Sequence, residues 1–353
     1  MIKALKILLA VIAAAAVVAG GATIYVNSKL DKISYTESKP VEQLTPNPEL
    51  EPTGEERSDI EFEMPTEEKA EDGGIVNILL LGTDLRIPNS SDPGRADCNM
   101  LCSINKGTGE IKLVSFERGI FVPIPQNLMP YGGTSDLLTH AYHWGGPDLS
   151  QSIISTCFNI DLAGYAQVDF DTFADVVDEI GGIDIELTQT ESDALNRHRY
   201  TNTQPLDRTV ESGQNHLNGY ETLQYCRLRF TDDDWVRQNR QRNALTACFN
   251  KIKTLNLLEL NSLADRVLPH INTNLSKQQI TGLLFAAPKI LSGQGIATLQ
   301  VPDKNMTETR YIECNFDYES KKISNFIYGT EYELKCPYTS VKPNYYEGHT
   351  IGS

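Results

Sequence analysis

The chain has 353 residues, which is enough for one large domain or two ordinary ones with an ample core. It holds 31 Lys and Arg against 47 Asp and Glu, a formal net charge of -16. No basic stripe offsets this balance, so nucleic acid is excluded as a partner for the whole chain, and a local group of arginines is expected to be an anion site.

The first 26 residues predict a membrane anchor. Lys3 and Lys6 precede an uncharged run at residues 7–26. Twenty residues at about 1.5 Å each make roughly 30 Å, the thickness of the hydrocarbon core of a bilayer. The lysines favour a cytoplasmic N-terminus, so a single-pass protein of the cell membrane with an extracellular C-terminal domain is expected. A cleaved signal peptide is the alternative, because residues 19–22 are small.

An extended spacer is predicted for residues 27–74. Residues 37–74 alone hold 13 Asp or Glu against 3 Lys or Arg, and prolines stand at positions 40, 46, 48, 52 and 65. Such a segment buries too little apolar surface to offset the entropy of ordering, and its charges repel one another. We expect it to hold the folded part away from the membrane.

The folded part is predicted to begin at residue 75 with a continuous apolar run, typical of a strand buried on both faces. Strands are expected at 75–82, 100–104, 111–116, 165–170, 183–187 and 297–301. Helices are expected at 148–158, 171–180, 218–226, 236–253, 258–266 and 276–290. Residues 106–109 predict a hairpin turn. Interleaved strands and helices predict an α/β fold, with α/β/α layers around a central mixed sheet.

A concentration of arginines near the middle of the chain is a candidate anion site. Its members are Arg227, Arg229, Arg237, Arg240 and Arg242, around aspartates at 232–234. Arg227 and Arg229 would share one face of an extended segment, and Arg237 would share a helix face with Gln241. A guanidinium group donates two parallel hydrogen bonds to a phosphate. A solvated helix face with salt bridges to the aspartates is the alternative.

A second charged group stands near the ends of the first three strands: Asp84, Arg86, Arg95, Asp97 and Arg118. The two carboxylates could share one hard cation such as Mg²⁺, which completes its shell with water and phosphate oxygens. Each aspartate alone could equally be a cap or turn residue. The six histidines have no metal-ligand spacing and are predicted to be structural or surface residues.

Short motifs occur in a fixed order at residues 77–86, 94–97, 113–118, 122–125, 140–142, 145–147, 168–170, 181–184, 217–219, 225–229 and 234–241. In this order they resemble the LytR–CpsA–Psr (LCP) family of cell-wall glycopolymer ligases, over roughly residues 75–255. The expected organisation is an anchor at 1–26, the spacer at 27–74, an LCP-like catalytic domain at 75–302 and a tail at 303–353 with no assigned role.

The resemblance implies transfer of a phosphate-linked glycopolymer, of teichoic acid or capsule type, from a polyprenyl-pyrophosphate carrier to peptidoglycan. It implies Mg²⁺, or alternatively Mn²⁺, as cofactor, with Asp84 and Asp97 as its ligands. Arg118 and Asp234 would be catalytic, although a salt bridge from Asp234 to Arg237 or Arg240 is an alternative. The pyrophosphate would be bound by Arg86, Arg95, Arg118, Arg227, Arg229, Arg237 and Gln241.

Four positions depart from the family pattern. Gly119 stands where the family usually has Asp, and Thr139 stands where it usually has Asn. Trp235 and Val236 replace the usual Phe-Gly pair. No expected metal ligand or arginine is lost, so these departures are expected to reshape the acceptor side of the pocket.

Two other functions use the same residues. A phosphatase or pyrophosphatase would use water as the acceptor, and a non-enzymatic membrane-anchored protein would bind the lipid or regulate without chemistry. All three need an apolar groove for the prenyl chain, and its expected walls are Ile153, Ile154, Phe173, Val176 and Val177.

Seven cysteines are an odd number for an exported chain. Cys98, Cys102 and Cys157 fall in apolar runs and are predicted to be core residues. A disulfide between Cys314 and Cys336 is an open alternative for the tail.

Overall fold

The computed structural model describes residues 28–47, 49–67, 74–84, 93–129, 131–197, 205–228, 234–293, 295–302 and 314–335. The side chains of residues 84, 168–172, 234, 235 and 257 also lie outside the description. No helix within these ranges is long and apolar enough to cross a bilayer, and the expected anchor at residues 7–26 lies outside them.

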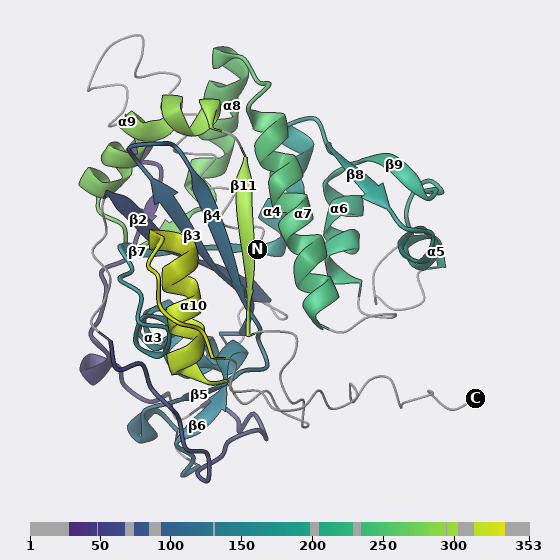
Figure 1. The fold of residues 1–353 in the computed structure, drawn as a ribbon. Helices are drawn as coiled ribbons and strands as arrows, with labels where there is room; N and C mark the ends of the chain where they lie inside the picture. The colour runs from purple at the N-terminus through teal and green to yellow at the C-terminus, as the bar shows by residue number, and fades with distance from the viewer. Residues whose placement is uncertain are drawn as a thin grey trace.

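A seven-stranded mixed sheet forms the centre of the fold (Figure 1). Its strands stand in the order β1 (Ser34–Tyr35), β10 (Asn272–Thr273), β7 (Gly164–Asp169), β2 (Ile75–Asp84), β3 (Arg95–Asn105), β4 (Ile111–Phe116) and β11 (Ile296–Val301). The pairs β1–β10, β7–β2 and β4–β11 are parallel, and the other neighbours are antiparallel. The predicted mixed sheet is confirmed.

Two small two-stranded antiparallel sheets stand apart from this sheet. The first pairs β5 (Phe121–Pro123) with β6 (Ser135–Leu137), and the second pairs β8 (Ile183–Leu187) with β9 (Gly213–Leu217). The strand predicted at 183–187 is therefore present, but it belongs to a two-stranded sheet beside α7 rather than to the central sheet.

The helices are α3 (Leu138–Cys157), α4 (Phe170–Glu179), α5 (Gln189–Arg197), α6 (Gly219–Arg227), α7 (Asp234–Ile252), α8 (Leu257–Val267), α9 (Lys277–Ser292) and α10 (Phe316–Tyr328). Single turns of 3-10 helix form η1 (Val41–Gln43), η2 (Gln126–Leu128) and η3 (Leu268–His270).

Helices cover both faces of the sheet, because both faces of its central strands are apolar (Figure 1). Ile78 and Leu80 of β2 pack in one layer with α4, α6, α7, α8 and α9. Leu79 and Leu81 point the other way and pack in a second layer with α3 and α10. We call these the α7 layer and the α3 layer. The predicted α/β/α arrangement is confirmed.

Local sequence explains the close packing of α4 and α6. On α4, Phe173, Val176 and Val177 recur at helical spacing, and all three are buried in the α7 layer as predicted. Gly219 begins α6, where an added Cβ would lie 2.0 Å from the carbonyl oxygen of Ala174. Only a residue without Cβ permits this approach of α6 to α4.

One helix is longer than predicted. The prediction began a helix at residue 148 because Gly145, Gly146 and Pro147 are breaker residues. In the structure α3 starts at Leu138, and its two parts are joined across a kink at Gly145 and Gly146. Proline is tolerated there because it stands in the first turn after the kink.

The predicted spacer and the predicted tail both contribute buried residues to the domain, which their composition did not indicate. Leu30 and Ile33 join the α7 layer, and Leu50 joins the α3 layer, so these parts of the 27–74 segment are not a free spacer. The segment assigned to the tail contributes α10, whose Phe316 and Ile323 are buried in the α3 layer. Few but well-placed apolar residues are enough to order both segments.

Candidate functional site

The ends of β2 and β3 bring the expected metal ligands onto neighbouring strands. Asp84, the last residue of β2, pairs with Arg95, the first residue of β3. The register then shifts, so that the pairing passes over Asp97 and leaves it as an additional residue of β3. A bulge of this kind redirects a side chain at the end of a ladder.

Asp97 and Arg118 form an ion pair at this corner of the sheet. Nη1 of Arg118 donates to Oδ1 of Asp97 over 2.9 Å. The Asp97 side chain is 11% exposed and the Arg118 side chain 27% exposed. Because both are largely buried, their charges are screened less than those of a surface pair. An expected metal ligand and an expected pyrophosphate ligand thus lie in contact.

Helix α7 carries a second expected arginine, Arg237, next to a residue that contacts the chain beside this corner. Glu117, next to Arg118, accepts a hydrogen bond from Nε2 of Gln238, next to Arg237. Glu117 is 2% exposed and Gln238 is 4% exposed. Since each arginine adjoins one partner of this buried contact, Arg118 and Arg237 are held on adjoining elements. Arg237 and Gln241 are themselves buried on α7.

The contact continues as a buried polar chain. Oε1 of Gln238 accepts from Nε2 of Gln300 over 3.3 Å, and Oε1 of Gln300 accepts from Nη2 of Arg242 over 3.2 Å. We call Glu117–Gln238–Gln300–Arg242 the polar chain; it ties the end of β4 to α7 and β11. Sequence reasoning missed this support, and its one signal was the spacing of four between Gln238 and Arg242.

Arg242 is a buried cation among neutral partners. It is 7% exposed, and its Nη2 also donates to the amide oxygen of Asn239 over 3.3 Å. Within the described residues its Nε and Nη1 make no hydrogen bond. Burial lowers the pKa of this guanidinium to about 10. Arg242 was expected in the arginine cluster, but the structure places it against the sheet.

Two other expected arginines lie differently from the prediction. Arg240 donates through Nε to Oε1 of Glu191 over 2.7 Å, so its carboxylate partner is on α5 and it supports the fold. Its Nη1 donates to the carbonyl of Leu228 over 3.1 Å. Arg227 is the last residue of α6 and not part of an extended segment. Arg86, Arg229 and the side chain of Asp234 lie outside the described residues.

The donor set fits a hard cation. Among the described residues no three His, Cys, Asp or Glu side chains gather as a metal cluster. Mg²⁺ needs only one or two carboxylates, with waters and phosphate oxygens completing the shell. Asp97 provides such a carboxylate at a bulge, and the backbone of Asp84 stands on the neighbouring strand. The Asp84 carboxylate itself lies outside the described residues.

Two of the departures from the family pattern lie beside Arg118. The backbone N–H of Gly119 donates to Oε1 of Glu117 over 3.3 Å, and the backbone N–H of Thr139 donates to the carbonyl of Arg118 over 3.1 Å. Thr139 is 4% exposed, and its hydroxyl has no hydrogen-bond partner in the described chain. Position 139 therefore contacts the corner from α3.

A family model of LytR_cpsA_psr matches residues 24–328, which is most of the chain. The chain belongs to the LytR_cpsA_psr (LCP) family.

Named relatives agree with this assignment. The teichoic acid transferase TagT of Bacillus subtilis (strain 168), named a polyisoprenyl-teichoic acid–peptidoglycan transferase, is 29% identical over 228 residues. That match covers 64% of this chain and 67% of the relative. TagU of Bacillus cereus, with the same activity in its name, is 30% identical over 212 residues, covering 58% of this chain and 62% of TagU.

Solved LCP structures share the fold. TagT bound to LI-WTA has a TM-score of 0.57 at 24% identity, covering 78% of this chain and 99% of that structure. The protein gbs0355 from Streptococcus agalactiae has a TM-score of 0.60 at 24% identity, covering 78% of this chain and 96% of that structure. A further structure, with a TM-score of 0.53 at 24% identity, is an LCP protein named with bound octaprenyl pyrophosphate. The matched region covers 78% of this chain and 99% of that structure.

The groove walls expected for this LCP domain cannot all line one groove. Phe173, Val176 and Val177 lie in the α7 layer. Ile153 and Ile154 lie in the α3 layer, on the opposite face of the sheet. The prediction treated them together because helical periodicity identifies an apolar face without saying which face of the sheet it covers. Only the α7 layer adjoins α7, the helix that carries Arg237.

The three cysteines predicted to be core residues are confirmed as such, and His140 makes a buried structural contact. Cys98, Cys102 and Cys157 are buried core residues. His140 is buried, and its Nδ1 lies 2.8 Å from Oδ1 of Asp136. Cys336 lies outside the described residues, so the alternative disulfide does too.

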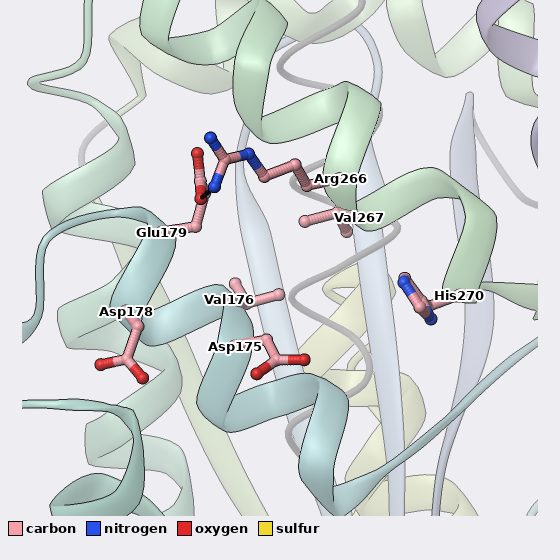
Figure 2. A pocket seen from close by; sticks show the side chains of 7 residues that line it. All are labelled: Asp175, Val176, Asp178, Glu179, Arg266, Val267 and His270. Carbon is pink, nitrogen blue, oxygen red and sulfur yellow. Dashed lines mark ion pairs between the residues drawn. The ribbon is translucent and has the colours of Figure 1, made fainter.

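A separate pocket lies between elements that do not form the Asp97–Arg118 corner (Figure 2). It measures about 470 Å³. Its lining residues come from α4, α8 and η3: Asp175, Val176, Asp178, Glu179, Arg266, Val267 and His270. Nη1 of Arg266 lies 2.5 Å from Oε2 of Glu179. The carboxylates outnumber the one arginine, which is paired, so this pocket lacks the character of an anion site.

Proposed function

We propose that this LCP protein transfers a phosphate-linked glycopolymer, of teichoic acid or capsule type, from a polyprenyl-pyrophosphate carrier to peptidoglycan. Family membership and the transferase names of its relatives support the reaction. The bound lipid in the name of one solved LCP structure supports the carrier. The observation that carries the proposal is the Asp97–Arg118 ion pair, joined through Glu117 and Gln238 to the helix of Arg237.

The chemistry needs stabilised charge more than a covalent intermediate. A sugar hydroxyl of the acceptor attacks the phosphorus that carries the glycan, and the phosphoanhydride bond to the lipid phosphate breaks. Negative charge then grows on the departing polyprenyl phosphate. Arg118, in the turn after β4, and Arg237, on α7, would donate charge-assisted hydrogen bonds to these oxygens. Arg86, Arg95, Arg227, Arg229 and Gln241 complete the proposed pyrophosphate site.

Asp84 and Asp97 would hold Mg²⁺ or Mn²⁺ in the proposed site. The ion would supply charge neutralisation at the phosphate oxygens. Asp234, the first residue of α7, is proposed to take the proton of the acceptor hydroxyl. With the predicted anchor at residues 7–26, the reaction would take place at the outer face of the cell membrane.

The test is transfer of a labelled glycan from its polyprenyl-pyrophosphate carrier to a peptidoglycan oligomer, by the full-length protein with and without Mg²⁺. Arg118→Ala is expected to lower turnover by about 100-fold or more, the usual effect of removing one donor to a developing oxyanion. Arg197→Ala is the matched control, because Arg197 is an exposed arginine of α5 paired with Asp193.

Each outcome separates the candidate functions. Acceptor-dependent product that requires Arg118 supports the transferase. Release of phosphate without any acceptor would instead identify a pyrophosphatase that uses water. Tight lipid binding with no turnover of the wild type would contradict catalysis and leave a lipid-binding protein.

A further inference from the structure

The first described residues pack against one end of the molecule. Lys29 forms an ion pair with Asp265 of α8, and Nζ of Lys32 lies 2.7 Å from the same carboxylate. Lys277, at the start of α9, forms an ion pair with Asp31. The segment that follows the predicted anchor is therefore attached to α8 and α9 as soon as it enters the described structure.

Apolar packing and strand pairing fix this attachment. Leu30 is 2% exposed and Ile33 is 6% exposed, both within the α7 layer. β1, which begins directly after Ile33, pairs with β10, and the backbone N–H of Ser34 donates to the carbonyl of Ile271 over 3.0 Å. Buried side chains and a strand pair cannot act as a long flexible tether. The described chain therefore begins beside α8 and α9, close to the end of the predicted anchor.

This end of the molecule is opposite the candidate site. Nε2 of Gln279, in the first turn of α9, donates to the carbonyl of Ala163, just before β7 begins. Because β7 is parallel to β2, α9 starts where β2 starts, whereas Asp84 stands where β2 ends. The ten residues of β2 span roughly 30 Å at about 3.3 Å each. In Figure 1, α8 and α9 lie at the top of the view, and β5 and β6 lie at the bottom.

Helix α7 connects the two ends. It begins with Asp234 at the candidate site, and its last residue, Ile252, is five residues before α8. Nineteen residues at about 1.5 Å each make it roughly 28 Å long. Its buried apolar side chains after Gln241, including Leu245, Cys248 and Phe249, belong to the α7 layer. A prenyl chain that leaves the site along this layer would reach the α8–α9 end.

The same end exposes large apolar side chains. Phe285 of α9 is 68% exposed and Leu258 of α8 is 82% exposed, the two highest values among the large apolar residues described. Gln278, Gly282, Phe285 and Lys289 make the exposed stripe of α9 at helical spacing. Aromatic and aliphatic side chains beside lysines are typical of a helix that lies in a membrane interface.

We propose that α8 and α9, with residues 28–35, form the membrane-facing end of the protein, and that Phe285 enters the interface between lipid headgroups and acyl chains. This places the pyrophosphate site about one helix length above the bilayer, with the α7 layer as the path of the prenyl chain. The inference rests on the proposed function, because it takes the predicted anchor and a prenyl substrate as given.

The experiment uses full-length protein in nanodiscs that contain brominated lipids, which quench tryptophan at short range. In Phe285→Trp, the brominated lipids are expected to quench much of the fluorescence that the introduced tryptophan adds to that of the parent protein. Tyr131→Trp is the matched control, because Tyr131 is 50% exposed and stands three residues past η2, in the chain that connects β5 with β6. Equal quenching in the two variants, or none in either, would overturn the proposal.

A second measurement separates failure of this inference from failure of the proposed function. Phe285→Ser should raise KM for a long-chain substrate in the bilayer about tenfold, the effect of losing one buried aromatic side chain. It should leave turnover of a short, water-soluble prenyl pyrophosphate unchanged. An unchanged KM for the bilayer substrate would contradict the membrane-facing end. Activity of the parent on neither substrate would contradict the proposed function, while the quenching result would still stand.

Discussion

Arg240 and Arg242 are two residues apart on α7, and both are buried, yet their surroundings differ. Arg240 has the carboxylate of Glu191 at 2.7 Å, whereas Nη2 of Arg242 contacts the amide oxygens of Asn239 and Gln300. A buried charge needs an opposite charge to offset the loss of water. Arg240 therefore supports the fold, and Arg242 costs stability while it is charged.

We expect Arg242→Met to raise the free energy of unfolding by about 1–3 kcal/mol at pH 7, because a buried charge is replaced by an apolar side chain of similar length. Burial lowers the pKa of Arg242 to about 10, below its unfolded value. As pH rises, Arg242 therefore loses its proton in the folded state before it does so in the unfolded state. The destabilisation caused by its buried charge is full below pH 10 and decreases above pH 10. The difference in free energy of unfolding between variant and parent, measured by urea unfolding, should therefore decrease from pH 7 to pH 11.

Arg240→Met is the control on the same helix. It leaves Glu191 buried without its cation, so a loss of about 3–5 kcal/mol is expected. If both variants are destabilised to the same extent, the assignment of Arg242 as an uncompensated charge is wrong.

At the scale of elements, the position of α7 depends on the Glu117–Gln238 contact. β4 ends at Phe116, and the next two residues are Glu117, which contacts α7, and Arg118, which contacts Asp97. α7 carries Gln238 next to Arg237. This buried hydrogen bond thus joins α7 to the turn that carries Arg118.

Gln238→Leu should lower stability by about 1–3 kcal/mol, because it leaves the buried carboxylate of Glu117 without its amide donor. The same variant should lower turnover by about tenfold or more through misplacement of Arg237. Thermal unfolding and glycan transfer, measured on the same preparations, check the two effects.

A double substitution distinguishes positioning from simple stability. Glu117→Leu with Gln238→Leu removes both partners of the contact, so much of the stability should return. Turnover should stay low, since the tie between β4 and α7 is still lost. Recovery of turnover together with stability would show that the contact has no positioning role.

The elements that sequence predicted best are those with strong periodicity. Helix α4 was placed within one residue of its observed ends, because Phe173, Val176 and Val177 repeat at helical spacing along it. Strand β9 was missed because Gly213–Leu217 is polar, and its pairing with β8 provides what its composition does not. The polar chain was beyond sequence reasoning, since it joins Glu117 to Gln300 through tertiary contacts alone.

For the molecule as a whole, the ordered motifs predicted the family, and the interleaved strands and helices predicted the mixed sheet. The charged residues near strand ends predicted that Asp97 and Arg118 lie at one edge of that sheet, but not their ion pair. They did not predict which apolar residues face which side of the sheet. In the sequence, Ile154 and Val177 are both apolar residues of predicted helices. In the structure they lie on opposite faces of the sheet, Ile154 in the α3 layer and Val177 in the α7 layer. Which layer holds the prenyl chain therefore depends on the fold.

Two matched substitutions test the side of the sheet on which the lipid lies. Val177→Trp adds bulk to the α7 layer, and Ile154→Trp adds bulk to the α3 layer; both positions are fully buried. Each should cost about 1–3 kcal/mol through overpacking, so thermal unfolding should shift by similar amounts. Retention of octaprenyl pyrophosphate, measured by native mass spectrometry, should fall only in Val177→Trp. Loss of lipid in Ile154→Trp alone would move the groove to the α3 layer, and with it the prenyl path would no longer run beside α7 toward the α8–α9 end.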